Sequence, residues 1–382
     1  MLFGRARELA EIEDQLRAAL AGDGRLLLVS GEPGIGKTRL AEEVDRMAAG
    51  LGMATCWGRA TEEEGSPPYW VFRQVVRSLA AAHPDRVAAL GPGAEDLTQL
   101  APELSRQPGR PARAGDDSSP HHRPGPPDAE ERFRLFETVG AFLAAVASEH
   151  GLLVVLDDLQ WADAASLLLA GHLARALSGT RLAVLATYRD TEVVGRGLLR
   201  DMLASVARQR GVARLRLVGL SPSAVGQQLA ALTGRPLADE VIADVSRRTL
   251  GNPFFVTELG RVLARRDAEP AGEVVGELPD AVRDAVRGRL SALSGGCRKL
   301  VAVASVLGSE VDTSTLAAVA GVDTAEVLAR LDEAAEAGIV RGVKPGAYRF
   351  AHDLVREAAR LDVPTALGLA VHLRAAEHLE QG

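Results

Sequence analysis

Residues 31–38 read G-E-P-G-I-G-K-T and match the pattern G-x-x-x-x-G-K-[ST] at every fixed position. Glycines let such a loop wrap a phosphate with consecutive backbone N–H groups, because side chains would block the approach. Lys37 then places a positive charge between the outer two phosphates, and the Thr38 hydroxyl is available to Mg²⁺. This segment, called the P-loop below, therefore predicts a grip on a nucleotide phosphate.

The neighbouring residues support this interpretation over an accidental glycine-rich turn. The apolar run "RLLLVS" (25–30) predicts a buried strand directly before the loop. The segment that follows Lys37 predicts a helix closed by Gly50, and the positive end of that helix faces the bound anion.

Acidic and basic side chains follow two further predicted strands. In "GLLVVLDD" (151–158), Asp157 is predicted to hold Mg²⁺ through water, as a Walker B aspartate does, and Asp158 to polarise the attacking water. The alternative for Asp158 is a strand-end turn residue or a helix N-cap. "ATYRD" places Thr187 and Arg189 at the end of the next strand, where a side chain can sense a γ-phosphate, although Arg189 can equally be a plain surface arginine.

The predicted site thus has three parts. The catalytic residues are Lys37, Asp157, Asp158 and Arg189, and the Mg²⁺ ligands are Thr38 and Asp157. The loop residues that bind nucleotide are Gly31, Glu32, Pro33, Gly34, Ile35, Gly36, Lys37, Thr38 and Arg39.

Up to about residue 220, apolar strands alternate with helices, which predicts an α/β P-loop NTPase core with a parallel sheet covered on both faces. We assign this domain to residues 1–220, with a flexible insertion at about 84–129, where Pro, Gly, Asp and Ser crowd the chain and apolar periodicity is missing. Three predicted helices form a helical lid over 221–278. Helices followed by a β-ribbon that turns at Pro345-Gly346 predict a winged-helix-like domain over 279–360, and a C-terminal helix covers 361–382.

Composition excludes several classes. A net charge of −7 argues against non-specific binding to DNA or to an anionic membrane, and 41 of the 44 basic residues are Arg. The N-terminus has no apolar stretch of a signal peptide, and no apolar run approaches the length of a membrane span, so we expect a cytoplasmic protein. Cys56 and Cys297 lack metal-ligand spacing and are expected to be idle thiols.

Several motifs together resemble the STAND class of AAA+-related signal-transduction ATPases. The match runs from "FGRARELAEI" through the P-loop, "ERFRLFETV", "VVLDDLQWAD", "LATYRD" and "GNPFFVTEL" to "YRFAHDLVREA", nearly the whole chain. The chain looks most like the ATPase region of the large ATP-binding LuxR-type regulators of actinobacteria. That resemblance implies adenine rather than guanine nucleotides, ATP or ADP with Mg²⁺, and slow hydrolysis.

The resemblance also implies roles that the residues alone leave open. Pro253, in "GNPF", would pack with Gly251 and Asn252 near the base and ribose; otherwise these residues are a loop between helices, capped by Asn. His352, in "FAHDL", would reach the β-phosphate of ADP and hold a closed state; otherwise it is a neighbour of a helix N-cap. Arg5 would lie near the adenine.

These regulators continue into helical repeats and a DNA-binding domain, whereas this sequence ends at "VHLRAAEHLEQG", so it is either a fragment or a stand-alone ATPase. The helix in the recognition position, 324–337, is acidic, so we expect no direct DNA binding. The leading hypothesis is an ATP/ADP switch that acts on itself or on an unknown protein partner. The alternatives are a constitutive ATPase that does work on a partner and a nucleotide-stabilised scaffold.

Overall fold

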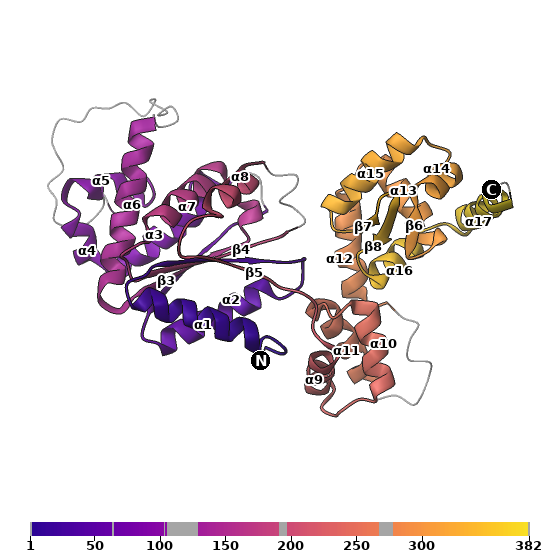
Figure 1. Ribbon diagram of the computed structural model, residues 1–382, viewed down its shortest axis with the longest axis horizontal. Coiled ribbons are helices and arrows are strands. Elements are labelled where there is room, and N and C mark those ends of the chain that lie inside the picture. Colours follow the sequence, from indigo (N-terminus) through magenta and orange to yellow (C-terminus); the bar gives the residue numbers. More distant parts are fainter. Residues whose placement is uncertain are drawn as a thin grey trace.

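The computed structural model describes residues 2–62, 65–102, 104, 129–190, 197–266 and 278–380. Five parallel strands form a sheet in the order β2-β3-β4-β1-β5 (Figure 1). Their bounds are β1 Arg25–Ser30, β2 Ala54–Arg59, β3 Leu152–Asp157, β4 Leu182–Tyr188 and β5 Val212–Arg216. Because all five run the same way, their carboxyl ends share one edge of the sheet, and the P-loop follows β1 at that edge.

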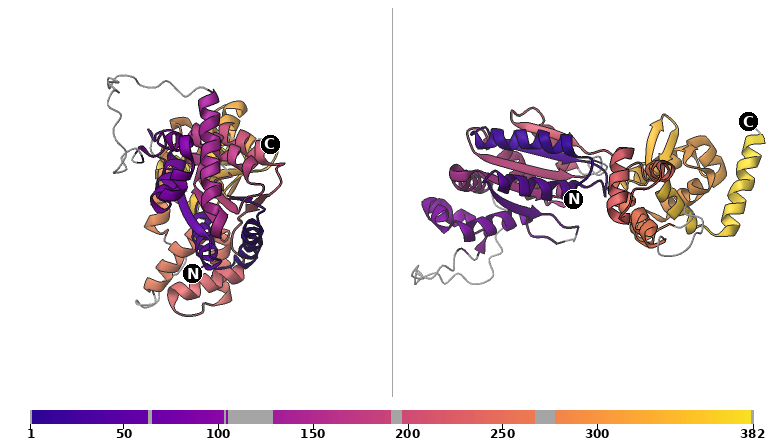
Figure 2. Two further views of the ribbon diagram at one scale, coloured as in Figure 1. Left: turned by 90° about the vertical axis from the view of Figure 1, so that its left-hand side faces the viewer. Right: turned by 90° about the horizontal axis from the view of Figure 1, so that it is seen from below.

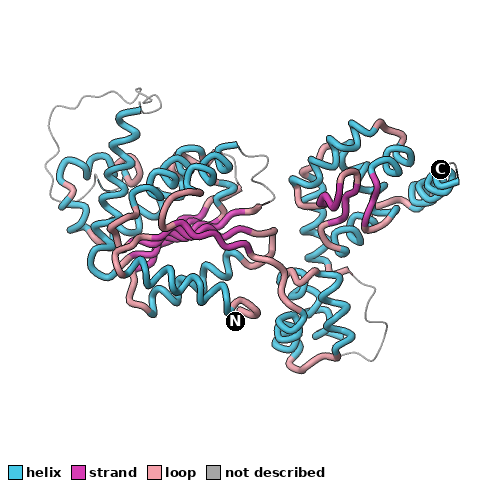
Figure 3. Tube along the Cα trace, in the orientation of Figure 1, coloured by secondary structure: helices cyan, strands magenta, loops and turns pink. Residues whose placement is uncertain are grey.

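Helices cover both faces of the sheet (Figure 3). Along β3, Leu153 and Val155 belong to the core under α1 (Ala6–Leu20) and α2 (Lys37–Gly50), while Leu152, Val154 and Leu156 belong to the opposite core. The opposite core is covered by α3 Trp70–Ala82, α6 Ala129–His150, α7 Ala164–Ala176 and α8 Gly197–Val206. Strands buried on both faces explain the continuous apolar runs of the sequence, and the predicted α/β P-loop fold is confirmed.

The structure corrects the start of the predicted flexible insertion at 84–129. Residues 84–104 include α4 (Pro84–Ala89), a 3₁₀ turn and α5 (Ala94–Leu97), which lie against α6. Leu97 and Leu100 are fully buried there. These helices are too short to show an apolar period in sequence, so the prediction was wrong for this part. Residues 105–128 lie outside the described residues.

After β5 the chain forms a second unit (Figure 2). Its helices are α9 Pro222–Thr233, α10 Asp239–Thr249, α11 Pro253–Arg266, α12 Asp280–Ser291, α13 Gly295–Leu307, α14 Thr313–Ala320, α15 Thr324–Glu336, α16 Asp353–Leu361 and α17 Thr365–Glu380. Strands β7 (Val340–Lys344) and β8 (Ala347–Phe350) are the predicted ribbon, and the unpredicted β6 (Glu310–Asp312) pairs with β8. A single apolar core runs from α9 through α17. We call residues 220–380 the C-terminal unit.

The chain passes from one core to the other over a few residues. Leu217 belongs to a core of the sheet and Leu220 to the core of the C-terminal unit. Between them, Gly219 lies so close to the turn after α10 that an added Cβ would stand 1.9 Å from the carbonyl oxygen of Leu250. Strand β5 ends before this link, at Arg216. In the described parts of the chain, no helix is long and apolar enough to cross a membrane.

Candidate functional site

Lys37 is the first residue of α2 and lies inside the P-loop. Its Nζ donates hydrogen bonds to the carbonyl oxygens of Gly31, at 2.9 Å, and Glu32, at 3.0 Å. Only 6% of Lys37 is exposed. Burial lowers the pKa of the Lys37 ammonium to about 8, and the nearby Asp158 carboxylate opposes part of that shift. The loop therefore holds a cation at its centre, at the point where a phosphate would need it.

Two glycines give the loop its shape. Gly34 and Gly36 have φ values of 78° and 98°, in the left-handed region that favours glycine. Gly36 immediately precedes α2, whose first N–H groups have no partner within the helix. A strand, a glycine loop and a helix N-terminus around a buried lysine fit the triphosphate or diphosphate of a nucleotide.

Asp157, the last residue of β3, is 1% exposed and is surrounded by donors. Thr187 donates to its Oδ1 at 2.6 Å, and Thr38 Oγ1 lies 3.1 Å from its Oδ2. Arg59, which was not predicted, also contacts this carboxylate, with its Nε 3.3 Å from Oδ2 of Asp157. The feature that could have identified Arg59 is its position at the end of β2, where it is in register with Asp157 at the end of β3.

These oxygen donors suit Mg²⁺ better than a softer metal. A hydroxyl and a carboxylate, from Thr38 and Asp157, are hard ligands, and Mg²⁺ is commonly bound by one or two such side chains together with substrate phosphates. Among the described residues, no group of three or more His, Cys, Asp and Glu side chains could form an all-protein metal cage. The residues present therefore fit a magnesium ion that arrives with its nucleotide.

A buried amide connects the remaining predicted residues at this edge. Gln160, which is fully buried and was not predicted, donates from Nε2 to Oδ1 of Asp158 at 2.8 Å and accepts at Oε1 from the backbone N–H of Arg189 at 3.1 Å. Asp158 has a φ of 61°, uncommon for a residue with a side chain. The Arg189 guanidinium lies 5.3 Å from the centre of the Trp161 ring. The ends of β3 and β4 are thus held together beside Lys37.

The two outlying arginines lie elsewhere. Arg5 is 4% exposed; its Nη2 donates to the carbonyl oxygens of Val218, at 2.6 Å, and Ile35, at 3.3 Å. Arg5 thus joins the P-loop to the link between the two units. Its Nη1 forms an ion pair with Glu8. Arg39 is exposed and pairs with Glu42 at 2.7 Å, so the structure does not bring it into the group around Asp157.

The turn before α11 lies directly on the P-loop. Asn252 donates from Nδ2 to the carbonyl oxygen of Pro33 at 3.1 Å, and the N–H of Phe254 donates to that of Gly34 at 3.3 Å. A Cβ added at Gly34 would stand 2.8 Å from the Cβ of Phe254. The predicted residue, Pro253, begins α11 between these two contacts. The hydrogen bonds between this turn and the P-loop are therefore made by the Asn252 side chain and by the backbone, not by Pro253.

His352 reaches the P-loop from the residue that precedes α16. Its Nε2 lies 3.0 Å from Oε2 of Glu32, and the ring packs edge-on against Phe255 with centroids 4.9 Å apart. The hydrogen bond from His352 lowers the pKa of the Glu32 carboxyl, against the effect of burial. The other ring nitrogen, Nδ1, is buried without a hydrogen-bond partner among the described residues. One buried ring atom therefore remains to be matched by a ligand.

Comparisons with known proteins agree with this geometry. Residues 1–185 match the family described as "AAA ATPase domain". A Walker-type ATPase of Pyrococcus abyssi superposes with a TM-score of 0.58 at 14% sequence identity, over 94% of this chain and 96% of that chain. A STAND protein (signal transduction ATPase with numerous domains) with a tetratricopeptide repeat sensor, from Pyrococcus horikoshii, gives a TM-score of 0.38 at 16% identity, over 100% of this chain and 45% of that chain. No curated protein matches the chain.

The likeness to the Pyrococcus abyssi protein shows the fold, because so low an identity carries nothing more; the second superposition is too weak to carry an argument. The family match covers the strands and loops that carry Lys37, Asp157 and Asp158. Taken with the arrangement of these side chains, it supports ATP binding and hydrolysis by this part of the chain. Residues 1–185 thus have the fold of a P-loop NTPase and match the AAA ATPase domain.

Proposed function

We propose that this protein is a nucleotide-operated switch, in which ATP or ADP with Mg²⁺ at the P-loop sets the position of the C-terminal unit. The observation that carries the proposal is the contact of that unit with three consecutive P-loop residues. His352 meets Glu32, Asn252 meets Pro33, and Phe254 meets Gly34. Phosphate binding and the position of the C-terminal unit are therefore coupled, because both involve the same residues of the P-loop.

The catalytic part of the proposal assigns one task to each group. Lys37 and the N–H groups at the start of α2 bind the outer phosphates, and Thr38 with Asp157 holds the ion, which neutralises phosphate charge when bound. Thr187 and Arg59 fix the Asp157 carboxylate in place. Asp158 orients the attacking water, and Gln160 holds its carboxylate. An aspartate is shorter than the glutamate common at this position, and we therefore expect slow hydrolysis.

His352 supplies the readout of the nucleotide. Its Nε2 is occupied by Glu32, so a phosphate oxygen at Nδ1 requires a proton on both ring nitrogens. The imidazolium would then lie between two anions, the Glu32 carboxylate and the phosphate. The family resemblance implies that this phosphate is the β-phosphate of ADP and that ADP favours the closed state. A ligand shifts a conformational equilibrium only by its difference in affinity for the two states.

The test is the rate at which labelled ADP leaves the protein. His352→Ala should release ADP faster than wild type, by about tenfold for the loss of one hydrogen bond to a charged group. His372→Ala is the matched control, because His372 is an exposed histidine on α17. Unchanged ADP release in His352→Ala, together with turnover that ignores the substitution, would instead favour a constitutive ATPase.

The setting of the switch is also part of the proposal. We place it in the cytoplasm, as a regulatory module of the kind found in LuxR-type transcription regulators, because the sequence motifs resemble that group. The helix α15 carries Glu326, Asp332, Glu333 and Glu336, and its Arg330 pairs with Glu326. Phosphate contacts need the opposite charge, so the output of this unit is proposed to be a protein contact or self-association.

A further inference from the structure

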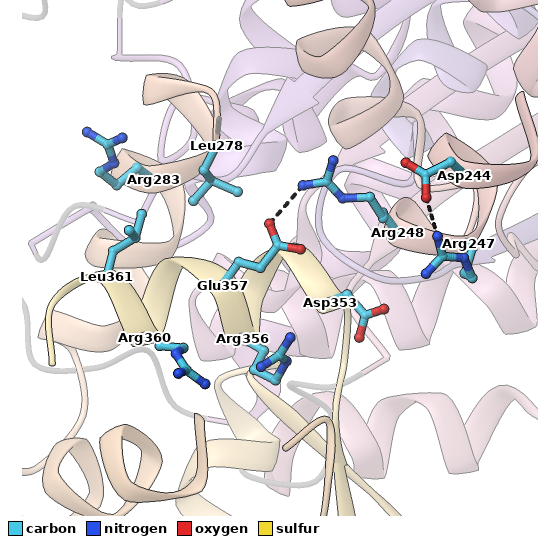
Figure 4. Close-up of a pocket in the computed structure, with 10 residues that line it drawn as sticks. All are labelled: Asp244, Arg247, Arg248, Leu278, Arg283, Asp353, Arg356, Glu357, Arg360 and Leu361. Atoms are coloured by element: carbon cyan, nitrogen blue, oxygen red, sulfur yellow. Dashed lines mark hydrogen bonds and ion pairs between the residues drawn. The ribbon is translucent and has the colours of Figure 1, made fainter. Parts of the chain in front are cut away.

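A cavity of 720 Å³ lies within the C-terminal unit, between α10, α12 and α16 (Figure 4), and no P-loop residue lines it. Its volume lies within the range of small-molecule sites, about 300–1,000 Å³. Five arginines line it: Arg247 and Arg248 from α10, Arg283 from α12, and Arg356 and Arg360 from α16. Nothing in the proposed nucleotide switch uses this cavity.

Three carboxylates share the cavity with the five arginines, which leaves it a net charge of +2 in a chain of net charge −7. Arg248 is buried and pairs with Glu357 at 2.8 Å, and Arg247 pairs with Asp244 (Figure 4). These two ion pairs leave the cations of α12 and α16 as the source of the excess charge. A local excess of buried or half-buried guanidinium groups is costly unless an anion compensates it.

Two of the cavity arginines, Arg283 of α12 and Arg356 of α16, are incompletely paired. The Nε atoms of Arg283 and Arg356 are buried and have no hydrogen-bond partner among the described residues. Arg283 does approach Asp280, at 3.3 Å, but that carboxylate is 88% exposed and screened by solvent. Arg356 makes a long contact, 3.4 Å from Nη1 to the carbonyl oxygen of Ser305. Buried donors normally have partners, so these two point to a missing acceptor.

We propose that this cavity binds a small anion with two or more linked phosphate groups. The planar guanidinium presents paired donors that match phosphate oxygens, and arginines from different helices can bind successive phosphates. A single carboxylate would compensate only part of the excess charge. The site is therefore an effector site, distinct from the P-loop.

An occupant would also act on the switch, and this second part rests on the proposed function. Arg356 lies one helical turn after His352, and α16 begins at Asp353, directly behind that histidine. An anion that bridges α12 and α16 would restrain α16 and with it the contact between His352 and Glu32. We expect the effector to slow the release of ADP.

Binding is tested by titration calorimetry with inorganic tripolyphosphate, at low salt and with a chelator present, on protein that carries Lys37→Ala to weaken the P-loop. We expect one tripolyphosphate per chain. Adding Arg356→Gln and Arg360→Gln should weaken the affinity about tenfold or more, since each removes charged hydrogen bonds. Arg287→Gln is the matched control, because Arg287 lies on α12 one turn from Arg283 but pairs with Asp362 outside the cavity.

Circular dichroism checks that each variant is folded. If Arg356→Gln does not fold, Arg360→Gln alone keeps the test valid, because Arg360 is exposed. Absence of binding in the Lys37→Ala protein, or an equal loss in Arg287→Gln, would overturn the site. With labelled ADP loaded first, tripolyphosphate should slow its release from wild type but not from the double variant. An unchanged rate there would overturn the coupling alone, whereas the switch itself fails only if His352→Ala leaves ADP release unchanged.

Discussion

Nε2 of His352 lies 3.0 Å from Oε2 of Glu32, although 320 positions separate the two residues in the chain. The contact joins the P-loop to the start of α16 across the boundary between the two units. His352 is 4% exposed and Glu32 is half-buried, so the interaction is partly shielded from water. A hydrogen bond between a histidine and a loop carboxylate thus closes the C-terminal unit onto the nucleotide site.

Replacing Glu32 with Gln should lower the free energy of unfolding by about 1 kcal/mol at neutral pH, because a charged hydrogen bond in a half-exposed position becomes a neutral one. The pKa of Glu32 is lowered from 4.5 in the folded protein. Its contribution is therefore complete above pH 4.5 and is lost as pH falls through the lower, folded-state pKa. Chemical unfolding of both proteins should show a constant difference at neutral pH that shrinks below pH 4.5. A difference that instead grows in acid would contradict this.

The affinity for ADP should fall as pH rises above the pKa of Lys37, which is about 8. Burial favours the neutral amine, and a phosphate needs the ammonium, so deprotonation competes with binding. For a bound form that keeps the proton, the dissociation constant rises about tenfold between pH 7 and pH 9. Fluorescence titrations with labelled ADP measure this directly. Lys37→Arg stays charged throughout and should bind with little pH dependence; the same slope in that variant would assign the effect to another group.

Gly34→Ala should loosen the contact between the turn before α11 and the P-loop. The new Cβ would stand 2.8 Å from the Cβ of Phe254, and the residue would keep a φ of 78°. Gly52→Ala is the matched control, because Gly52 has a φ of 82° and open space around its Cβ position. We expect both to lose about 1 kcal/mol of stability from backbone strain, and Gly34→Ala to lose a further 1–3 kcal/mol from the clash. Equal thermal unfolding temperatures for Gly34→Ala and Gly52→Ala would show that the turn before α11 moves aside at no cost in stability.

Asp157→Asn should abolish Mg²⁺-dependent hydrolysis while leaving the fold intact. The amide keeps the shape of the side chain and accepts from Thr187, but it loses the charge that binds the ion and pairs with Arg59. Phosphate release from ATP, followed with and without Mg²⁺, measures the effect. Thr187→Val, which removes one donor to the same carboxylate, should give a smaller loss. Hydrolysis at the wild-type rate in Asp157→Asn would remove Asp157 from the proposed mechanism.

Neither cysteine should react with a disulfide reagent in the folded protein. Cys297 is fully buried, and burial, reinforced by Glu333, raises the pKa of its thiol to about 12; burial also raises the pKa of Cys56. Thiolate is the reactive form, so both sites are expected to be silent until the chain unfolds. Counting reactive thiols with and without denaturant checks this. Rapid labelling of native protein would indicate that a unit opens.

The residues that the sequence could identify are those whose chemistry depends on neighbours along the chain. Lys37 and Thr38 follow their glycines directly, and Asp157 follows an unbroken apolar strand, so the local pattern was sufficient. The sheet followed from alternating strands and helices, and the helices of the C-terminal unit from their periodicity. The short helices at 84–97 contain too few residues to show a period, which is why that region was misread.

Arg59, Gln160 and the contact of Asn252 with the P-loop could not be identified in this way, because they depend on contacts across the fold. Arg59 meets Asp157 only through the pairing of β2 with β3, and Asn252 meets Pro33 across 219 positions. The contact of His352 with Glu32 could not be predicted from the sequence for the same reason. The family resemblance implies that this histidine contacts a phosphate, whereas in the structure its Nε2 contacts a side chain of the P-loop itself.

The separation of His352 from Glu32 also sets an order in time. A ribosome that adds roughly 5–20 residues per second needs on the order of 15–60 s to travel from one to the other. Once β5 has been completed at Arg216, the P-loop and its sheet have been made, while His352, which closes over them, has not. The nascent chain can therefore bind its first nucleotide before the closing contact exists. Each new molecule starts in the open state and reaches the closed state afterwards.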